Sequence, residues 1–317
     1  MIRLYNAVKD YFLQTASPPP KLTTVPWRET SKRGMGVTPL QLEMELIQQI
    51  KKLQPQNRKQ PIHQRQEINL LIQGPVSAGK SSFINSVLSY KCSSRITKAG
   101  AGSCSDSYTK CLADYTEEEL PKGYRIFDCM GLEPTDRKGF HINDFELLIE
   151  GHIKTGYQFN HLSPITNSNN KFRKTPNFWN KMHCVIFVVS AVSIQAGLQA
   201  EYVIKINDMQ KTLKDQDIPS ILILTKVDEL CDEVEKDITK MFWSIKVRDA
   251  VQTAKDLFGI EVASVYPVKN YVKDLNIYTE MNIPLLLALK GAMHVAEAKI
   301  NRYKERLRQE NDEDNNN

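Results

Sequence analysis

The feature that most constrains this chain is an apolar run that ends in a glycine-rich loop, a lysine and two serines. The segment reads INLLIQGPVSAGKSSFINSVL, from Ile68 to Leu88. From Gly74 to Ser81 it matches the phosphate-binding pattern GxxxxGK[ST] at every fixed position. The run before the loop is typical of a strand and the pattern after it of a helix. A phosphate-binding loop requires that context.

Each residue type in the loop has a physical reason. Glycines let backbone N–H groups turn inward without a Cβ clash, and these groups and the positive helix end then face phosphate oxygens. We expect Lys80 to reach the β- and γ-phosphates, the Ser81 hydroxyl to bind Mg²⁺ and Ser82 to bond the α-phosphate. The expected phosphate-binding set is Gly74, Ser77, Ala78, Gly79, Lys80, Ser81 and Ser82. The alternative, a chance match, arises on the order of once per hundred chains of this length.

A second motif follows in YRIFDCMGLEP, where residues 124–127 predict a strand that ends at Asp128. Asp128 is expected to hold Mg²⁺ through water, and the Gly131 N–H to contact the γ-phosphate. The pattern DxxG alone is short, so its weight comes from its place after a strand and downstream of the loop. An ordinary Asp–Gly turn at a strand end is the alternative.

A third motif indicates which base, guanine or adenine, a bound nucleotide would carry. The strand-like run ILILTKVDEL ends in Thr225, Lys226, Val227 and Asp228, the pattern [NT]KxD. A carboxylate at Asp228 matches the guanine N1–H and exocyclic amine, whereas adenine presents an acceptor there, and two such bonds give selectivity of roughly a hundredfold. Most such motifs have asparagine where this chain has Thr225, so we expect the loop to lose an amide brace. A plain surface strand end is the alternative.

The last expected strand is followed by PVKNY, which fits the place of a loop that contacts the guanine oxygen. Lys269 and Asn270 are the candidate residues of this loop. The stretch departs from the common Ser-Ala-Lys form. With it, the expected nucleotide site has phosphate, metal and base elements, and its ligands are GTP or GDP and Mg²⁺, with Ser81 and Asp128 as metal ligands.

The order of these motifs within alternating strand and helix patterns predicts an α/β fold of the P-loop NTPase, GTPase type. Strands are expected at 68–73, 110–115, 124–128, 184–190, 221–225 and 262–268. Helices are expected from Thr38-Pro39 onward and at 81–89, 197–213, 232–257 and 283–308. The sheet is expected to be mostly parallel. We divide the chain into an N-terminal arm with one amphipathic helix (1–66), a GTPase domain (67–298) with an insertion at about 133–180, and a helix extension with an acidic, Asn-rich tail (299–317).

Bulk properties exclude several classes of protein. The formal net charge of the 317 residues is +5 with both signs interspersed, which argues against a nucleic-acid partner. The six cysteines form no CxxC pair, so free thiols in a reducing compartment are expected. No apolar stretch approaches the length of a membrane span, and the N-terminus does not read as a signal peptide.

The motifs resemble the translation-factor-like class of P-loop GTPases and, more specifically, the interferon-induced protein 44 family. The similar stretches are PWRE, GPVSAGKSSFINSV, FDCMGL, INDFELLIEGHIKTGYQFN and PVKNY, which together span roughly residues 25–298. The resemblance implies a cytoplasmic, interferon-induced protein of antiviral and immune defence. Family members often carry an N-terminal TLDc-type domain, and we expect it to be lacking here because too few residues precede the loop.

Hydrolysis is expected to be slow. Small GTPases place a water-orienting glutamine after DxxG, and this chain has Leu132 there. Glu133 is a candidate substitute, although a carboxylate near phosphates is a poor partner. The first switch should lie between residues 91 and 109. The remaining catalytic or Mg²⁺-closing candidates are Ser103, Ser105 and Thr109, and Arg95 is either an internal arginine finger or a solvated loop residue.

Two classes of function remain open. The chain is a guanine-nucleotide switch with slow or partner-stimulated hydrolysis, or an interaction protein that binds nucleotide for stability. In either case a protein partner or self-association is expected through the insertion or the last helix. That helix carries a stripe of Leu286, Leu289, Met293, Ala296, Ile300, Tyr303 and Leu307. Its end is either a solvated extension or a helix that docks on a second copy or an anionic surface.

Overall fold

A computed structural model describes residues 21–29, 37–53, 66–92, 94–100, 110–116, 120–135, 139 and 141–314. Within these ranges the chain is an α/β structure, as the sequence predicts. Three residues considered for the first switch lie outside the described residues: Ser103, Ser105 and Thr109.

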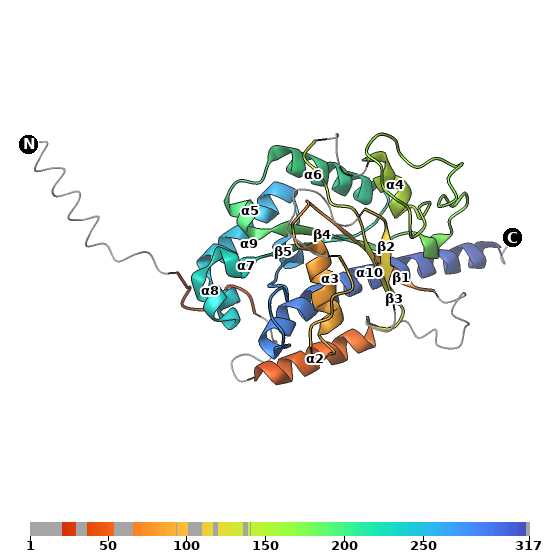
Figure 1. Cartoon of the computed structure of the whole chain (residues 1–317). Helices are drawn as coiled ribbons and strands as arrows, with labels where there is room; N and C mark the ends of the chain where they lie inside the picture. Colours follow the sequence, from red (N-terminus) through yellow and green to blue (C-terminus); the bar gives the residue numbers. More distant parts are fainter. Residues whose placement is uncertain are drawn as a thin grey trace, which may run out of the picture.

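A six-stranded sheet forms the centre of the molecule, in the order β2-β3-β1-β4-β5-β6 (Figure 1). The strands are β1 (Ile68–Gln73), β2 (Ala113–Tyr115), β3 (Tyr124–Asp128), β4 (Cys184–Ser190), β5 (Ser220–Thr225) and β6 (Val265–Pro267). All neighbouring strands pair in parallel except β2, which runs antiparallel to β3 at the sheet edge. The expectation of a mostly parallel sheet is confirmed.

The central strands are buried along their whole length and mostly apolar because helices cover both faces. Every residue of β1 and β4 is buried, which explains their continuous runs of Ile, Leu and Val rather than an alternating pattern. Register follows from the same burial, with Leu70 opposite Ile126 in β3 and opposite Cys184 in β4. The sheet therefore separates two apolar clusters, one on each face.

Helices from different parts of the chain cover the two faces. One cluster takes residues from α4 (Asn143–Ile149), α5 (Ala191–Gln195), α6 (Ala200–Asp215), α7 (Val227–Leu230), α8 (Asp232–Lys236) and α9 (Ile245–Phe258). The other takes residues from α2 (Pro39–Lys52), α3 (Lys80–Ser89) and α10 (Thr279–Asp314). Figure 1 shows α10 running along the sheet with α2 beside its first half. None of the helices in the described ranges carries an apolar stretch long enough to cross a lipid bilayer.

The expectation of one helix over 232–257 is wrong. The chain forms α8, then a 3-10 helix from Ile238 to Trp243, and then α9. Two capping residues cause the breaks: Asp237 accepts a hydrogen bond from the Thr239 N–H, and Ser244 accepts one from the Val247 N–H. Both caps have extended backbone, which a continuous helix does not allow.

Two strands are shorter than expected because local contacts compete with the sheet. Residues 110–112 pair with the segment 156–159 of the insertion: the Leu112 N–H donates to the Tyr157 carbonyl at 2.9 Å, and the Phe159 N–H to the Lys110 carbonyl at 3.0 Å. Only Ala113–Tyr115 then remains for β2. At the other edge, residues 262–264 form a 3-10 turn before β6 begins.

The described part of the N-terminal arm packs on the same body as the sheet. The Trp27 N–H donates to the Phe242 carbonyl at 2.8 Å, and the Trp27 ring lies against the Phe242 ring. The Arg28 guanidinium donates to the Val265 carbonyl at 2.6 Å and to the Val262 carbonyl. This arm segment therefore fastens the start of β6.

The last helix makes contacts with the body beyond residue 299, where we place the start of the extension. Lys299, only 6% exposed, donates to the Asp217 carbonyl at 2.7 Å, and Arg302 and Arg306 pair with the Asp217 carboxylate at 3.2 and 3.5 Å. The Tyr303 ring stacks on Phe178 of the insertion, with ring centres 3.6 Å apart. Residues 301–312 are otherwise exposed, so most of the extension is solvated, and docking on a second copy or an anionic surface stays a prediction.

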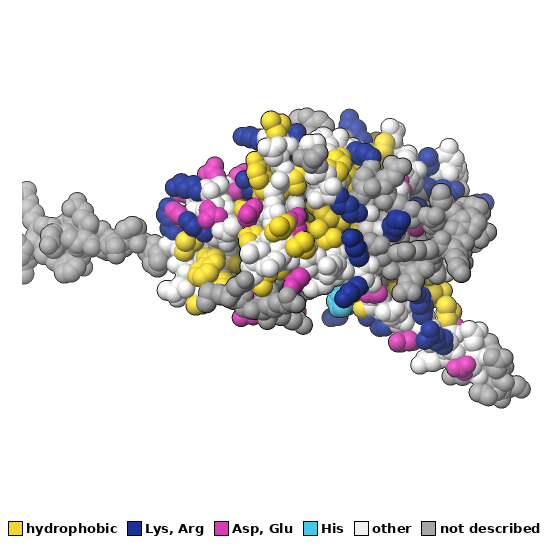
Figure 2. Space-filling model, turned by 90° about the horizontal axis from the view of Figure 1, so that it is seen from below, with side chains coloured by type: hydrophobic (Ala, Val, Ile, Leu, Met, Phe, Trp, Pro, Cys, Tyr) yellow, Lys and Arg dark blue, Asp and Glu magenta, His cyan; other side chains and the backbone are white. Residues whose placement is uncertain are grey.

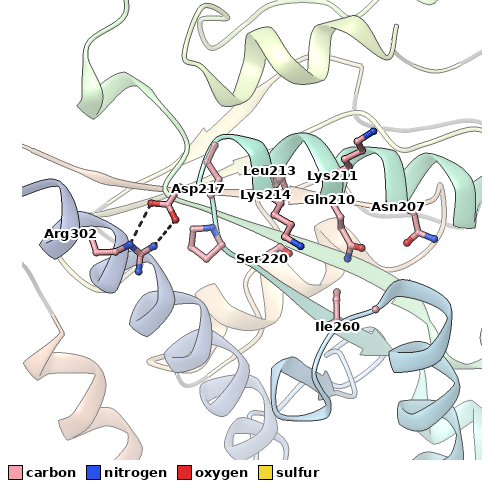
Figure 3. A pocket seen from close by; sticks show the side chains of 12 residues that line it. Asn207, Gln210, Lys211, Leu213, Lys214, Asp217, Ser220, Ile260 and Arg302 are labelled. Atoms are coloured by element: carbon pink, nitrogen blue, oxygen red, sulfur yellow. Dashed lines mark hydrogen bonds and ion pairs between the residues drawn. The ribbon is translucent and has the colours of Figure 1, made fainter. Parts of the chain in front are cut away.

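Arg302 and Asp217 also border a surface hollow of about 570 Å³ at the amino end of β5 (Figure 3). This hollow lies at the opposite end of β5 from Thr225. Beyond Arg306 the helix projects from the body and carries both signs of charge (Figure 2). Three of the six Lys and Arg residues of α10, namely Lys299, Arg302 and Arg306, thus contact the α6–β5 turn, and Lys304 and Arg308 are exposed.

Candidate nucleotide-binding site

The sequence-predicted site residues come together at one edge of the sheet. Parallel strands place their carboxyl ends at the same edge, and ligands of open α/β sheets bind there. The phosphate-binding loop follows β1, Asp128 ends β3, Thr225 ends β5, and Lys269 follows β6. The three motifs and the PVKNY loop thus face one region, although they are spread over about 200 residues of sequence.

The glycines of the loop are required by close packing and by backbone geometry. Gly74 has a φ of +150°, and a Cβ there would lie 2.1 Å from the Val188 carbonyl oxygen. Gly79 has a φ of +93° and is the N-cap of α3. Gly74 therefore lies tightly against β4, where a side chain would require a shift of the backbone. At Gly79 the left-handed φ itself favours glycine, and a Cβ would lie 3.0 Å from Asn270 Nδ2.

Lys80 lies inside the loop. Its Nζ donates to the Pro75 carbonyl at 2.9 Å and to the Gly74 carbonyl at 3.1 Å. Burial lowers the pKa of Lys80 below its ordinary value, and the negative charge of Asp128 acts in the opposite direction. A Cβ on Gly131 would lie 2.9 Å from the Lys80 Nζ, so the DxxG motif is in direct contact with this lysine.

Ser81 and Asp128 form the candidate metal centre. The Ser81 hydroxyl donates to Asp128 Oδ2 at 2.9 Å, and both side chains are buried. A hydroxyl and a carboxylate are the hard oxygen ligands that Mg²⁺ prefers. Two residues 47 positions apart therefore supply the donor set that the sequence motifs predict.

Thr225 lacks the amide of the common motif, as expected, but its hydroxyl supplies a brace to the loop. The Thr225 hydroxyl donates to the Ala78 carbonyl, so the shorter side chain still ties the end of β5 to the phosphate-binding loop. An amide reaches the same loop from the PVKNY segment, since Asn270 Nδ2 donates to the Gly79 carbonyl at 3.2 Å. The brace is therefore divided between two residues that come from two strands.

Two of the residues that the sequence predicts to contact the base, Lys269 and Asp228, lie next to each other. The Lys269 ammonium is 4.0 Å from Asp228 Oδ2, and each side chain is about one-fifth exposed, at 21% and 23%. Burial raises the pKa of Asp228, and the positive charge of Lys269 counteracts that rise. Lys226 has a left-handed backbone with φ of +60° at the start of α7, which turns the chain sharply between Thr225 and Asp228.

The residues considered for a role in GTP hydrolysis, Leu132, Glu133 and Arg95, differ in burial and in their contacts. The Leu132 side chain is 2% exposed and belongs to the apolar core, while its N–H donates to the Gly74 carbonyl at 2.9 Å. Glu133 is half-buried, and its backbone carbonyl accepts from Lys205 Nζ at 3.0 Å. Arg95 donates to the Val272 carbonyl, just past the PVKNY loop. Leu132 is thus a structural contact between the DxxG motif and the loop.

One residue at the site escaped the sequence analysis. Gln73 is fully buried at the end of β1, and its Oε1 accepts from the Gly74 N–H at 2.9 Å. Its Nε2 lies 3.8 Å from the Cys129 sulfur. The sequence signal for it was a polar amide in an otherwise apolar run, immediately before the first glycine of the loop. Tyr271, which ends the expected PVKNY loop, is 1% exposed.

Comparisons with known proteins give one set of clear relatives. No protein-family model matches the chain. Among solved structures, the apo form of translation elongation factor SelB from Methanococcus maripaludis is 14% identical, with a TM-score of 0.32, over 64% of this chain and 29% of that one. A probable GTP-binding protein EngB is 13% identical, with a TM-score of 0.36, over 63% of this chain and 88% of that one.

Curated relatives are more similar in sequence. Human interferon-induced protein 44-like is 29% identical over 235 residues, which cover 73% of this chain and 52% of that protein. Mouse interferon-induced protein 44 is 29% identical over 236 residues, which cover 73% of this chain and 55% of that protein. The chain spans about half the length of these relatives. It is a relative of the interferon-induced protein 44 and 44-like proteins over that stretch, and the resemblance seen in its motifs is confirmed.

Proposed function

We propose that the chain binds guanine nucleotides and Mg²⁺ and hydrolyses GTP slowly or when stimulated by a partner. The observation that carries this proposal is the meeting of the phosphate loop, the Ser81–Asp128 pair and Asp228 at one sheet edge. Each part supplies a different need of a nucleoside triphosphate: a cradle for phosphate, oxygens for a divalent cation, and a carboxylate for the base.

The preference for guanine rests on Asp228. A carboxylate accepts two hydrogen bonds from the guanine N1–H and exocyclic amine, and adenine has no donor at N1. The partial burial of Asp228 raises its pKa from an ordinary value of 3.8, and the nearby Lys269 ammonium favours the charged form. A carboxylate that holds its charge beside a lysine, in a site partly shielded from water, discriminates bases more strongly than an exposed one.

The metal would be held by Ser81 and Asp128. Bound Mg²⁺ would neutralise charge on the phosphate oxygens, while the ammonium of Lys80 donates to the same group of oxygens. To do so, Lys80 must exchange its bonds to the Gly74 and Pro75 carbonyls for bonds to phosphate. Because burial already disfavours the lysine charge, a phosphate dianion is a better partner than two neutral carbonyls.

Slow turnover follows from Leu132. Its side chain lies in the apolar core and has no group that can orient a water molecule. The same observation favours a second candidate function, an interaction protein that binds nucleotide for stability and does not turn it over. Steady-state GTP turnover, measured alone and with increasing protein concentration, separates the two functions. Turnover that rises with self-association supports the switch, and its absence at all concentrations supports the scaffold.

Cellular roles are carried over from the names of the relatives. We propose that the protein is interferon-induced and acts in the antiviral immune response. The names of its relatives support the first of these two properties, induction by interferon. A cytoplasmic location fits the five described cysteines, all of which are free thiols. Transcript measurement after interferon treatment, and imaging of the tagged protein, test these two points.

The base assignment is tested with Asp228→Asn. An amide reverses one donor–acceptor match, so the variant should lose guanine affinity and gain affinity for xanthosine nucleotides. The change is about a hundredfold if two hydrogen bonds to a charged group are lost. Fluorescent GDP and XDP binding to the wild type and the variant measures it. An unchanged GDP affinity in the variant would remove Asp228 from the base site.

A further inference from the structure

A chain of buried hydrogen bonds runs from α2 to the loop that follows β6. Its members are Glu43 on α2, Asn282 on α10 and Tyr271 of the loop, which are 8%, 2% and 1% exposed. Buried polar groups are costly unless they are fully paired, so a continuous set of this kind fixes the geometry of the elements that it joins. Figure 1 shows α2 beside the first half of α10, and these hydrogen bonds lie between the two helices there.

The links between the helices are short. Asn282 Nδ2 donates to Glu43 Oε1 at 2.6 Å, and the Thr279 hydroxyl donates to Glu43 Oε2 at 2.7 Å. Both carboxylate oxygens of Glu43 are therefore engaged by the first turn of α10. Since one carboxylate holds two donors from successive positions of a helix, the orientation of α10 relative to α2 is fixed at this point.

The next link reaches the loop. The Tyr271 hydroxyl lies 3.0 Å from Asn282 Oδ1 and 2.9 Å from the Tyr278 carbonyl, and it accepts from the Tyr278 N–H at 2.9 Å. Its single proton serves one of the two oxygens at a time. The Tyr271 ring is thereby held on the start of α10.

The far end of the chain touches the phosphate-binding element. The Tyr271 N–H donates to the Ser86 hydroxyl on α3 at 2.9 Å, and the neighbouring Asn270 donates to the Gly79 carbonyl at 3.2 Å. Lys269, the next residue back, lies beside Asp228. Any displacement of the Tyr271 ring is therefore transmitted within two residues to the candidate base site.

We propose that Glu43, Asn282 and Tyr271 are positioning residues that set base selectivity by holding the Lys269–Asn270 segment in place. The inference rests on the proposed guanine-nucleotide function. Glu43 and Asn282 belong to none of the nucleotide motifs, and Tyr271 is the last residue of the PVKNY loop. They act through the position of Lys269, and they make α2, which lies outside the motif-bearing part of the chain, a determinant of nucleotide preference.

The useful readout is the ratio of GDP to ADP affinity. The two nucleotides present the same phosphates, so a general loss of stability weakens both by a similar factor. A displaced Lys269–Asn270 segment weakens GDP more than ADP, because the loss of base contacts adds to any effect that Asn270 has on the phosphate-binding loop. The ratio therefore separates a positioning role from a merely structural one.

The test uses Tyr271→Phe and Glu43→Gln, with Gln49→Ala as the matched control. Phenylalanine keeps the buried ring and removes the hydroxyl, while glutamine keeps the shape of Glu43 and removes one acceptor. The control removes a 2.9 Å hydrogen bond between the same two helices, from Lys290 to Gln49, farther along α10. Both test variants should lower the GDP-to-ADP affinity ratio about three- to tenfold, the effect of one lost hydrogen bond, and Gln49→Ala should not.

Three other results would overturn the inference. An unchanged ratio in both test variants means that the chain of bonds serves stability alone. An equal fall in the Gln49→Ala variant means that contact between α2 and α10 in general, rather than this path, sets the ratio. A wild type that binds GDP and ADP equally refutes the proposed guanine preference itself, and the positioning role falls with it. Thermal unfolding of each variant confirms that the compared proteins are folded.

Discussion

Replacing Lys80 by methionine should separate ligand binding from folding. Lys80 is buried, and its ammonium donates to the Gly74 and Pro75 carbonyls. Each carbonyl keeps a second donor in the variant, because Gly74 also accepts from the Leu132 N–H at 2.9 Å and Pro75 from the Ala78 N–H at 3.3 Å. Methionine therefore leaves neither carbonyl orphaned and fills a similar volume.

The magnitude follows from two opposing contributions. Methionine removes the desolvation cost of the buried ammonium, which is several kcal/mol per ion, while the two lost hydrogen bonds oppose this gain by about 1.5–3 kcal/mol each, so the two contributions nearly cancel. We expect the free energy of unfolding of Lys80→Met to stay within about 1 kcal/mol of the wild type. Triphosphate affinity should fall about a hundredfold or more, since two charged hydrogen bonds to phosphate are lost.

The pH dependence gives a second check on the same variant. Burial lowers the pKa of Lys80 from 10.5, so the unfolded chain binds this proton more tightly than the folded chain. The charged lysine therefore costs stability at neutral pH, and that cost declines as pH rises through the folded-state pKa toward 10.5. Between pH 7 and pH 10, the free energy of unfolding of the wild type should therefore rise relative to that of Lys80→Met. Urea unfolding at both pH values, with GTP-analogue calorimetry, measures both effects. A loss of more than about 2 kcal/mol at pH 7 would refute the reasoning and make Lys80 a structural residue.

Three further changes probe the loop and the last helix. Thr225→Val should speed GDP release severalfold in stopped-flow measurements because it removes the hydroxyl that donates to the loop, whereas Thr225→Ser should not. Gly131→Ala should lower the free energy of unfolding by about 1–3 kcal/mol in urea, since its Cβ would lie 2.7 Å from Val76 Cγ2. Deleting residues 299–317 should lower the melting temperature by several degrees because the stacked and ion-paired part of α10 is lost, and deleting only 307–317 should not.

Elements defined by local patterns were predictable from the sequence. β1, β3 and β4 begin and end where continuous apolar runs predict, because strands buried on both faces need no alternating pattern. The convergence of the motifs at one edge also followed, since parallel strands order their carboxyl ends together. Asp128 and Ser81 thus meet as the motif spacing indicated.

Features that depend on distant partners were not predictable. The first residues of the expected second strand pair with the insertion, and nothing in residues 110–112 names that partner. The sequence of the last helix does not indicate that Asp217 engages Lys299 and Arg302, because Asp217 lies more than 80 residues earlier. The motif shows only that Thr225 has no amide, and the approach of Ala78 in the fold is needed to show that the Thr225 hydroxyl reaches the loop.

The most direct test of a guanine-nucleotide site is calorimetric titration of the purified wild-type chain with GDP, a non-hydrolysable GTP analogue and ADP, each with Mg²⁺. The carboxylate of Asp228 beside Lys269 predicts GDP and GTP-analogue affinities about a hundredfold higher than that of ADP. Equal affinities for GDP and ADP, or binding of neither guanine nucleotide, would contradict the account.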